Sequence, residues 1–168
     1  HGLGVGRGIV ILDNSLTFTC AQDGNATNHS YPRSTDPASG TSRTITAVGE
    51  TQHTITNAPY DPATGIITVT ISNHNFSNGD YIKLDDNSLT YTCTLDSNAT
   101  NHTYPRATDR VSGRWLAISN VTQNTFDINV GANSEGGAHT FVSATSNGLK
   151  RQTGTLTVNV GTSSNTTN

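Results

Sequence analysis

The chain has 168 residues, of which 32% are hydrophobic and 12% charged, and its formal net charge is −3 at pH 7. Average domains contain about 45–50% apolar and about 25% charged residues. Here polar uncharged residues dominate instead, with 29 Thr, 18 Asn, 16 Ser and 16 Gly. Threonine favours strands, and Asn, Ser and Gly favour turns. This composition excludes an all-helical or coiled-coil protein. Disorder of the highly charged type is also excluded, because Val, Ile, Leu and Phe recur at short intervals.

No apolar run reaches the roughly 18 residues that a membrane-spanning helix needs, so we expect no membrane partner. The nine basic residues are scattered along the chain, which argues against a nucleic-acid partner. A weakly charged, lysine-poor surface is typical of extracellular or virion proteins, and we expect that location. The chain begins at His1 without an apolar signal sequence, so we expect a processed or excerpted segment of a longer protein.

An internal repeat is the strongest signal in the sequence. Residues 14–40 read NSLTFTCAQDGNATNHSYPRSTDPASG, and residues 87–113 read NSLTYTCTLDSNATNHTYPRATDRVSG. Nineteen of these 27 positions are identical at an offset of 73 residues. The repeating unit is therefore about 73 residues long and occurs about twice.

Apolar residues alternate with threonine within each repeat, as in Leu16, Phe18 and Cys20, and this period of two marks half-buried strands. The sequence predicts an all-β fold of two tandem antiparallel β-sandwich modules, immunoglobulin-like in architecture. We assign residues 1–58 to a first repeat that lacks its first strand, and residues 59–168 to a second repeat with extra C-terminal strands. The expected strands of the second repeat are 65–72, 81–84, 89–94, 115–121, 125–130, 139–144 and 155–160. Residues 23–40 and 96–113 are expected to form ordered loops.

Equivalent positions in the two repeats should have equivalent burial if each repeat folds into the same module. The expected buried pairs are Leu16/Leu89, Phe18/Tyr91, Ile45/Ile118 and Ile55/Ile128.

The string DNSLTFTC…DGNATNHSYPRSTD and its second copy resemble tandem β-repeats in structural proteins of tailed phages, particularly phages of aquatic bacteria. The resemblance covers about three quarters of the chain. It implies a virion or fibre component built from β-sandwich modules, and it supplies no catalytic residues.

Each loop begins with oxygen-bearing residues at alternate positions, as a calcium-binding loop does. The candidate calcium ligands are Asp23, Asn25 and Thr27 in the first repeat and Asp96, Asn98 and Thr100 in the second. The alternative is that these side chains cap their own turns. No other cofactor is expected.

Further along each loop, the Tyr-Pro-Arg string predicts that Arg33 pairs with Asp36 and Arg106 with Asp109. Cys20 and Cys93 occupy the same repeat position. We therefore expect them to be too far apart for a disulfide, which requires Cα atoms within about 7 Å.

The first repeat lacks the strand that residues 65–71 provide upstream of the second repeat, and residues 154–160 match that strand. The predicted assembly strand carries Gly154, Leu156, Val158 and Val160, and the predicted groove carries Ile9, Ile11, Leu16 and Phe18. We expect the C-terminal strand of one subunit to complete the first module of the next, which gives a head-to-tail homopolymer. Two alternatives remain: the chain is cut from a continuous repeat array, or the strand folds back on its own second module.

The predicted function is therefore that of a structural subunit of an extracellular or virion-associated filament. An enzyme is not expected, because no activated nucleophile or carboxylate pair can be recognised from the spacing. The alternative function is a carbohydrate- or receptor-binding β-sandwich module of a phage fibre or surface protein, with a glycan as its partner.

Overall fold

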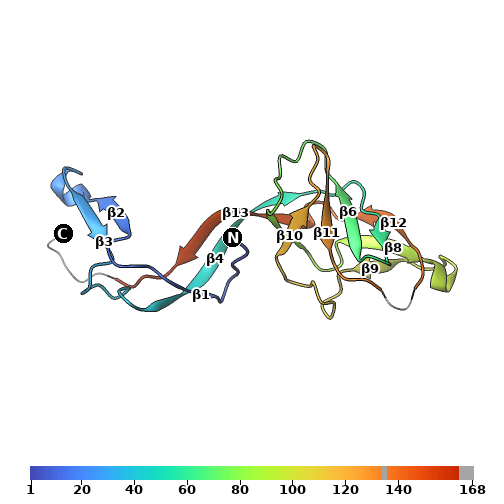
Figure 1. Ribbon diagram of the computed structural model, residues 1–168, viewed down its shortest axis with the longest axis horizontal. Coiled ribbons are helices and arrows are strands. Elements are labelled where there is room, and N and C mark those ends of the chain that lie inside the picture. Colours follow the sequence, from blue (N-terminus) through green and yellow to red (C-terminus); the bar gives the residue numbers. More distant parts are fainter. Residues whose placement is uncertain (134–135, 163–168) are drawn as a thin grey trace. The chain divides into compact units, whose positions relative to one another are not determined.

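The computed structural model describes residues 1–133 and 136–162, and over that range the chain folds almost entirely into β-strands (Figure 1). In the first repeat the elements are β1 (Gly8–Val10), β2 (Leu16–Thr19), the 3₁₀ turn η1 (Ala21–Asp23), β3 (Asn28–Tyr31) and β4 (Ser42–His53). The following elements are β5 (Tyr60–Asp61), β6 (Ile66–Thr70), β7 (Tyr81–Leu84), β8 (Leu89–Cys93), η2 (Thr94–Asp96), β9 (His102–Tyr104), β10 (Leu116–Ser119), β11 (Thr125–Asn129), β12 (His139–Ala144) and β13 (Leu149–Val158). In this part of the chain no helix is long and apolar enough to cross a membrane.

The chain divides into two compact units. The large unit contains His1–Gly2 and Gly49–Gly154, and the small unit contains Leu3–Val48 and the described residues 155–162. This division differs from the expected domains 1–58 and 59–168. The last part of the C-terminal strand, from Thr155, belongs with the first repeat, and residues 49–58 belong with the second.

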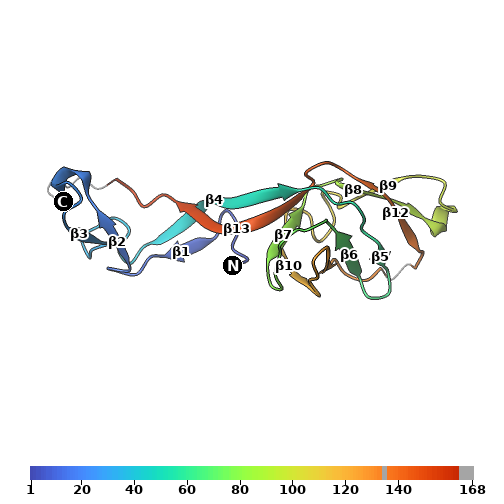
Figure 2. The same ribbon diagram turned by 90° about the horizontal axis from the view of Figure 1, so that it is seen from above.

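The large unit holds the main hydrophobic core. Its strands pair antiparallel: β11 lies between β6 and β10 (Figure 1), and β12 pairs with both β5 and β8, which are labelled with it in Figure 2. The buried members of the core are Ile55, Ala58, Ile67, Val69, Ile71, Phe76, Ile82, Leu84, Leu89, Tyr91, Val111, Ile118, Phe126, Ile128, Val130 and Leu149.

The six strands predicted between residues 65 and 144 are all found. The seventh, predicted at 155–160, is longer than expected, because β13 already begins at Leu149. The predicted ordered loop 96–113 contains the short strand β9, which pairs with β8.

The all-β antiparallel class is confirmed, whereas the tandem immunoglobulin-like arrangement is not. Eleven of the described strands form one sheet, in the order β1-β4-β13-β7-β10-β11-β6-β5-β12-β8-β9, and β2 and β3 form a separate two-stranded sheet. Sequence identity between the repeats has therefore not produced two identical modules in this chain.

The expected equivalence of the two cores is wrong for the β2 hairpin. Leu89 is fully buried (0% exposed) and Tyr91 is 4% exposed, whereas Leu16 is 39% and Phe18 is 54% exposed. The physical reason is the neighbouring strands. In the large unit β8 lies between β9 and β12, and its Leu89 and Tyr91 pack into the hydrophobic core, whereas β2 pairs with β3 alone and its Leu16 and Phe18 are not part of that core.

The isoleucine pairs are buried as expected, but by different means. Ile118 and Ile128 face each other across the β10–β11 hairpin. The equivalent stretch of the first repeat is the single long strand β4, so Ile45 is buried in the small unit and Ile55 in the core of the large unit.

Turn chemistry explains why only one copy makes this hairpin. Asn120 has a φ of 50°, in the left-handed region that asparagine tolerates. The Thr122 hydroxyl also accepts hydrogen bonds from the backbone N–H groups of Asn124 and Thr125, at 3.3 and 3.0 Å. At the equivalent positions the first repeat has Ala47 and Gly49, which offer neither the asparagine side chain nor the hydroxyl.

Candidate functional site

The loop after β2 and its copy after β8 have the same hydrogen-bond pattern. In the second copy the Thr100 hydroxyl donates to Asp96 Oδ2, and His102 Nε2 lies 3.0 Å from the same oxygen. In the first copy Thr27 and His29 contact Asp23 Oδ2 in the same way, with a His29–Asp23 separation of 3.2 Å. The two loops are thus closely matched local structures in different surroundings.

These contacts change the acidity of the aspartates. Hydrogen bonds from Thr100 and then His102 lower the pKa of Asp96 to about 2. The pKa of Asp23 is also lowered, chiefly by its hydrogen bond from Thr27. The charged carboxylate is therefore the form that organises each loop.

The same contacts bear on the calcium interpretation. Asp23 Oδ1 accepts the Ala26 N–H, and its Oδ2 accepts the Thr27 N–H, both at 3.2 Å. Asn25 and Asn98 have left-handed backbones, as turn residues do. In the described part of the chain no three His, Cys, Asp or Glu side chains gather in a metal-binding group. This geometry favours turn capping by Asp23, Asn25 and Thr27 and by Asp96, Asn98 and Thr100.

The predicted arginine–aspartate pairs are confirmed. Asp36 Oδ2 accepts the backbone N–H of Arg33 at 2.8 Å, and Arg33 Nη2 donates to Asp36 Oδ1 at 3.1 Å. Arg106 and Asp109 repeat these contacts at 2.8 and 3.0 Å. The guanidinium and backbone hydrogen bonds lower the pKa of Asp36. Each pair closes the loop that follows β3 or β9.

The cysteines lie in different surroundings. Cys93 is buried and its thiol is free, so the two cysteines form no disulfide with each other, as expected, and Cys20 is half-buried.

The predicted groove and all of the predicted assembly strand except Gly154 lie in the small unit. Leu156, Val158 and Val160 are half-buried, and the residues between them are exposed. The Thr46 hydroxyl donates to the Thr157 carbonyl at 3.1 Å, and the Tyr31 hydroxyl donates to the Val160 carbonyl at 3.5 Å. Gly154 is the last residue of the large unit.

Within one chain, this strand therefore completes its own small unit and does not fold back on the second repeat. Of the groove residues, Ile9 and Ile11 are half-buried, and Ile9 lies opposite Arg43 in the β1–β4 ladder. Leu16 and Phe18 stay exposed even with the C-terminal strand in place.

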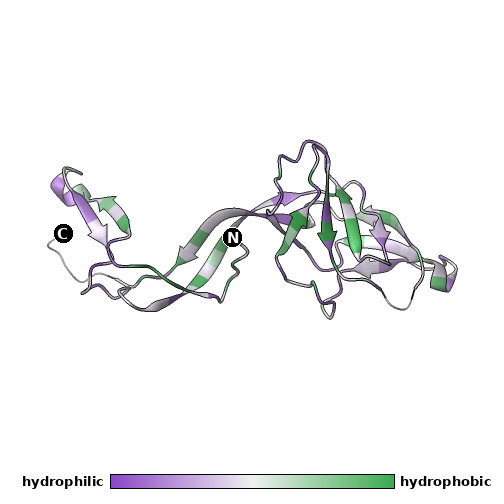
Figure 3. Ribbon diagram, viewed as in Figure 1, coloured by the Kyte–Doolittle hydropathy of each residue, from purple (hydrophilic) through white to green (hydrophobic). Residues whose placement is uncertain are grey.

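Exposed apolar side chains concentrate in the first eighteen residues of the chain. Five of the seven large hydrophobic residues that are exposed in the described structure lie there: Val5, Val10, Leu12, Leu16 and Phe18. Hydrophobic colour on the solvent-exposed β2 marks part of this set in Figure 3. We call these five residues the exposed apolar residues of the small unit.

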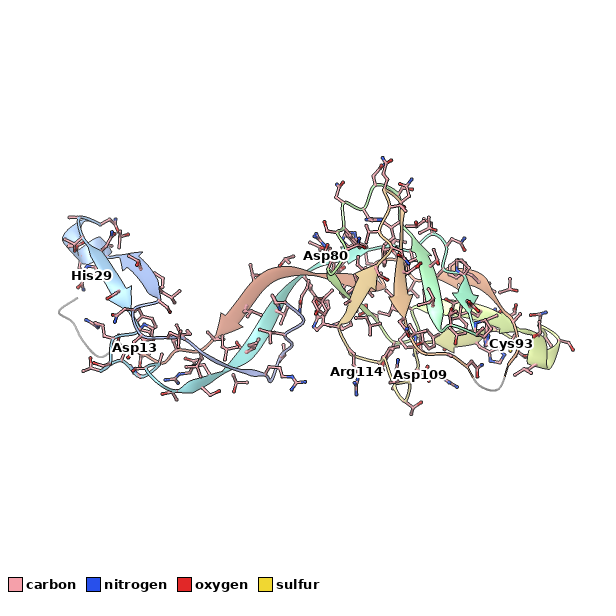
Figure 4. All side chains as sticks on the ribbon, viewed as in Figure 1. Asp13, His29, Asp80, Cys93, Asp109 and Arg114 are labelled. Carbon is pink, nitrogen blue, oxygen red and sulfur yellow. The ribbon has the colours of Figure 1, made fainter. Side chains whose placement is uncertain are left out.

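The large unit contains a cavity of about 720 Å³ beside the second loop. Its inner wall carries apolar and aromatic side chains, namely Tyr60, Ile67, Tyr91, Tyr104 and Val130. Its polar residues are Asp96, Asn101, His102, Thr103, Arg106, Asp109, Arg110, Asn133 and His139. Asp109 and Cys93, which also lines the cavity, are labelled in Figure 4.

Several polar groups around the cavity are already paired with protein atoms. The Tyr60 hydroxyl donates to the Gly131 carbonyl at 2.9 Å, and the Tyr91 hydroxyl donates to the Ala58 carbonyl at 2.8 Å. Burial raises the pKa of Tyr91, and burial followed by the charge of Asp109 raises the pKa of Tyr104. Both phenols are therefore neutral around pH 7.

His139 differs from these groups. Its Nδ1 atom is buried and has no hydrogen-bond partner among the described residues. The ring stands edge-on to Tyr60, with centroids 5.6 Å apart. A buried polar atom without a partner carries an energetic cost that a ligand or a water can relieve.

Sequence reasoning singled out several residues that line this cavity, among them Tyr91, Cys93 and Asp96, as members of the repeated motif but not as parts of one site. Tyr60 and His139 lie outside the repeated motif, and Arg110 has Pro37 at the equivalent position of the first repeat. No spacing pattern connects these three residues, and only the fold brings them to one cavity. Comparisons with protein-family models, with curated proteins and with solved structures found no match to the chain.

Proposed function

We propose that the chain is a structural subunit that polymerises head to tail, with residues 154–160 of one copy inserted into the small unit of the next. The observation that carries this proposal is the contrast between two nearly identical hairpins. The β8 hairpin is enclosed by its neighbours, whereas the β2 hairpin leaves Leu16 and Phe18 exposed.

The exposed apolar residues of the small unit supply the driving force. Removing a Leu or Phe side chain from water is worth about 1.5–3 kcal/mol, and five exposed apolar residues lie among the first eighteen of the chain. The second repeat shows one way in which Phe18 could be covered. Its equivalent Tyr91 packs edge-on against Phe141 of the adjacent strand, with ring centroids 5.9 Å apart. A second copy of the chain is the partner that carries matching surfaces.

The C-terminal strand supplies the connection. Its half-buried Leu156, Val158 and Val160 alternate with exposed residues, so one face of the strand suits a groove. In one chain the strand occupies its own small unit. Exchange of the same strand between copies keeps the contacts of that strand, which makes strand swapping inexpensive. The gain in stability then comes from the second copy that the exchange brings against the exposed Leu16 and Phe18. A heterologous contact of this kind propagates into a filament unless it closes into a ring.

In this proposal the exchanged strand holds two copies together, and the second copy covers Leu16 and Phe18, which the strand alone leaves exposed. We place this polymer outside the cell or on a virion, because the surface is weakly charged and poor in lysine. Its role in this proposal is mechanical and not enzymatic.

A mixing experiment tests the exchange. The C20A/C93A background removes the native thiols, and Thr46→Cys and Thr157→Cys are introduced into separate chains, because residues 46 and 157 are in contact. After mixing, partial unfolding and refolding, a short bis-maleimide should produce a cross-linked dimer of the two different chains. Each variant treated alone is the control for dimers between like chains. If the mixture yields no dimer beyond these controls, the strand stays within its own chain and the proposal is wrong.

Truncation provides the second test. Removal of residues 154–168 should give chains that no longer elongate in light scattering and negative-stain microscopy. A peptide of residues 154–161 should bind the truncated chain, and a peptide with Leu156, Val158 and Val160 changed to Ser is the control. Filaments formed by the truncated chain would overturn the proposal.

A further inference from the structure

We infer that the cavity of the large unit binds a neutral saccharide. The inference does not depend on polymerisation, because every residue that lines the cavity lies between Tyr60 and His139. Its volume of about 720 Å³ falls within the roughly 300–1,000 Å³ of typical small-molecule sites.

The aromatic wall suits a sugar ring. The hydroxyl of the half-buried Tyr60 is bonded to a backbone carbonyl, so this residue offers its ring rather than its hydroxyl to a ligand, and the buried Tyr91 forms the floor behind it. An aromatic ring is electron-rich on its face. The C–H groups on one side of a pyranose ring are weakly electropositive and pack well against such a face.

The charges of the cavity favour a neutral ligand. Asp96 is paired with His102 at 3.0 Å, and Asp109 with Arg106 at 3.0 Å. With Arg110 included, the lining carries two carboxylates and two guanidinium groups, which cancel when the histidines are neutral. An anionic ligand would face two carboxylates at short range, and a cation would face two guanidinium groups.

The polar groups of the cavity match sugar hydroxyls, each of which can both donate and accept a hydrogen bond. Arg110 and Asn101 supply donors, Asn101 and Asn133 supply amide oxygens, and the buried Nδ1 of His139 lacks a partner among the described residues. A hydroxyl group placed beside His139 would satisfy this atom in either tautomer.

The chain contains its own control for this site. His29 makes the same contacts with Asp23 and Thr27 that His102 makes with Asp96 and Thr100. Only His102 lines the cavity. Separate substitutions of His29 and His102 therefore distinguish a role in ligand binding from a role in holding the loop.

The experiment is a titration of the full chain, followed by ¹H–¹⁵N NMR, with the methyl glycosides of glucose, galactose, mannose and N-acetylglucosamine. For a ligand of about twelve non-hydrogen atoms we expect a Kd on the order of 1 mM for the preferred glycoside. Sodium glucuronate and inorganic phosphate serve as charged probes. The shifted resonances should include Tyr104 and His139.

The variants decide the location of binding. His102→Gln and Arg110→Ala should each weaken binding about tenfold, whereas His29→Gln should leave the Kd unchanged. Arg110 is exposed, so Arg110→Ala should keep the fold. It therefore tests the site even if His102→Gln fails to fold. The inference is overturned if no glycoside shows saturable binding, or if glucuronate or phosphate binds more tightly than the glycosides. It is also overturned if His102→Gln and His29→Gln change the Kd equally. If the chain binds a glycoside but forms no filaments, the saccharide site is supported and only the proposal of a filament is refuted.

Discussion

Asn120 donates a hydrogen bond from Nδ2 to Asp127 Oδ2 at 2.8 Å, across the turn that joins β10 to β11. The other carboxylate oxygen of Asp127 accepts the Thr68 hydroxyl at 2.7 Å, from the neighbouring strand β6. The turn is therefore tied to a third strand. The first repeat has Ala47 and Thr54 at the positions of Asn120 and Asp127, so it cannot make this connection.

Asn120→Ala should lower the free energy of unfolding of the large unit by about 1–3 kcal/mol. The variant loses one hydrogen bond, and alanine must adopt a left-handed backbone. Thermal or urea unfolding followed by circular dichroism would measure the change. The matched control is Ala47→Asn, which lies in the extended strand β4 and should change stability by less than about 0.5 kcal/mol. Equal effects of the two changes would contradict the turn explanation.

Leu89→Ala and Leu16→Ala make the same chemical change in the two repeats. Leu89 is fully buried, so its truncation should cost about 2–5 kcal/mol. Leu16 is largely exposed, and its truncation should cost the single chain less than about 1 kcal/mol. Chemical unfolding of both variants at low protein concentration measures the difference. Under conditions of polymerisation, Leu16→Ala should raise the concentration at which filaments form, and an unchanged concentration would count against burial of this residue in the polymer.

Tyr91→Phe removes the hydroxyl that donates to the Ala58 carbonyl at 2.8 Å. Because Ala58 is fully buried, its carbonyl would lose this partner, and we expect a loss of about 1–3 kcal/mol. The reciprocal change Phe18→Tyr places a hydroxyl at an exposed position and should be neutral within about 0.5 kcal/mol. Urea unfolding of the two variants tests this prediction, and equal stability of Tyr91→Phe and the parent chain would refute it.

Acid should loosen the second loop through Asp96. The pKa of Asp96 is lowered from 3.8 to about 2 by Thr100 and His102, so folding favours the charged form. The stabilisation is fully present above the unfolded pKa and is lost as the pH falls through about 2. NMR titration of the Asp96 carboxyl carbon should show a midpoint well below that of an unperturbed aspartate. Asp96→Asn should abolish the transition, and a midpoint near 3.8 would contradict the hydrogen bonds described above.

The sequence predicted the features that depend on neighbours in the chain. The strands between residues 65 and 144 follow the alternation of apolar and polar residues along the chain, and they are found as predicted. The Arg33–Asp36 and Arg106–Asp109 pairs join residues three positions apart, and they too are found as predicted. Burial of Leu16 could not be predicted from its copy Leu89, because the strand that encloses Leu89 comes from residues 139–144, some fifty residues later in the chain. The cavity depends on the same kind of distant contact, since it joins Tyr60, Tyr104 and His139.

In an isolated chain the two copies of the hairpin would face different evolutionary pressures. A buried Leu89 restricts mutation strongly, while an exposed Leu16 on an isolated chain would be free to drift toward polar residues. Yet 19 of the 27 aligned positions are identical, and Leu16 and Phe18 have kept their apolar character. Such retention is expected if Leu16 and Phe18 lie against another surface when the protein is assembled, since both copies of the hairpin would then be under the same constraint to stay apolar.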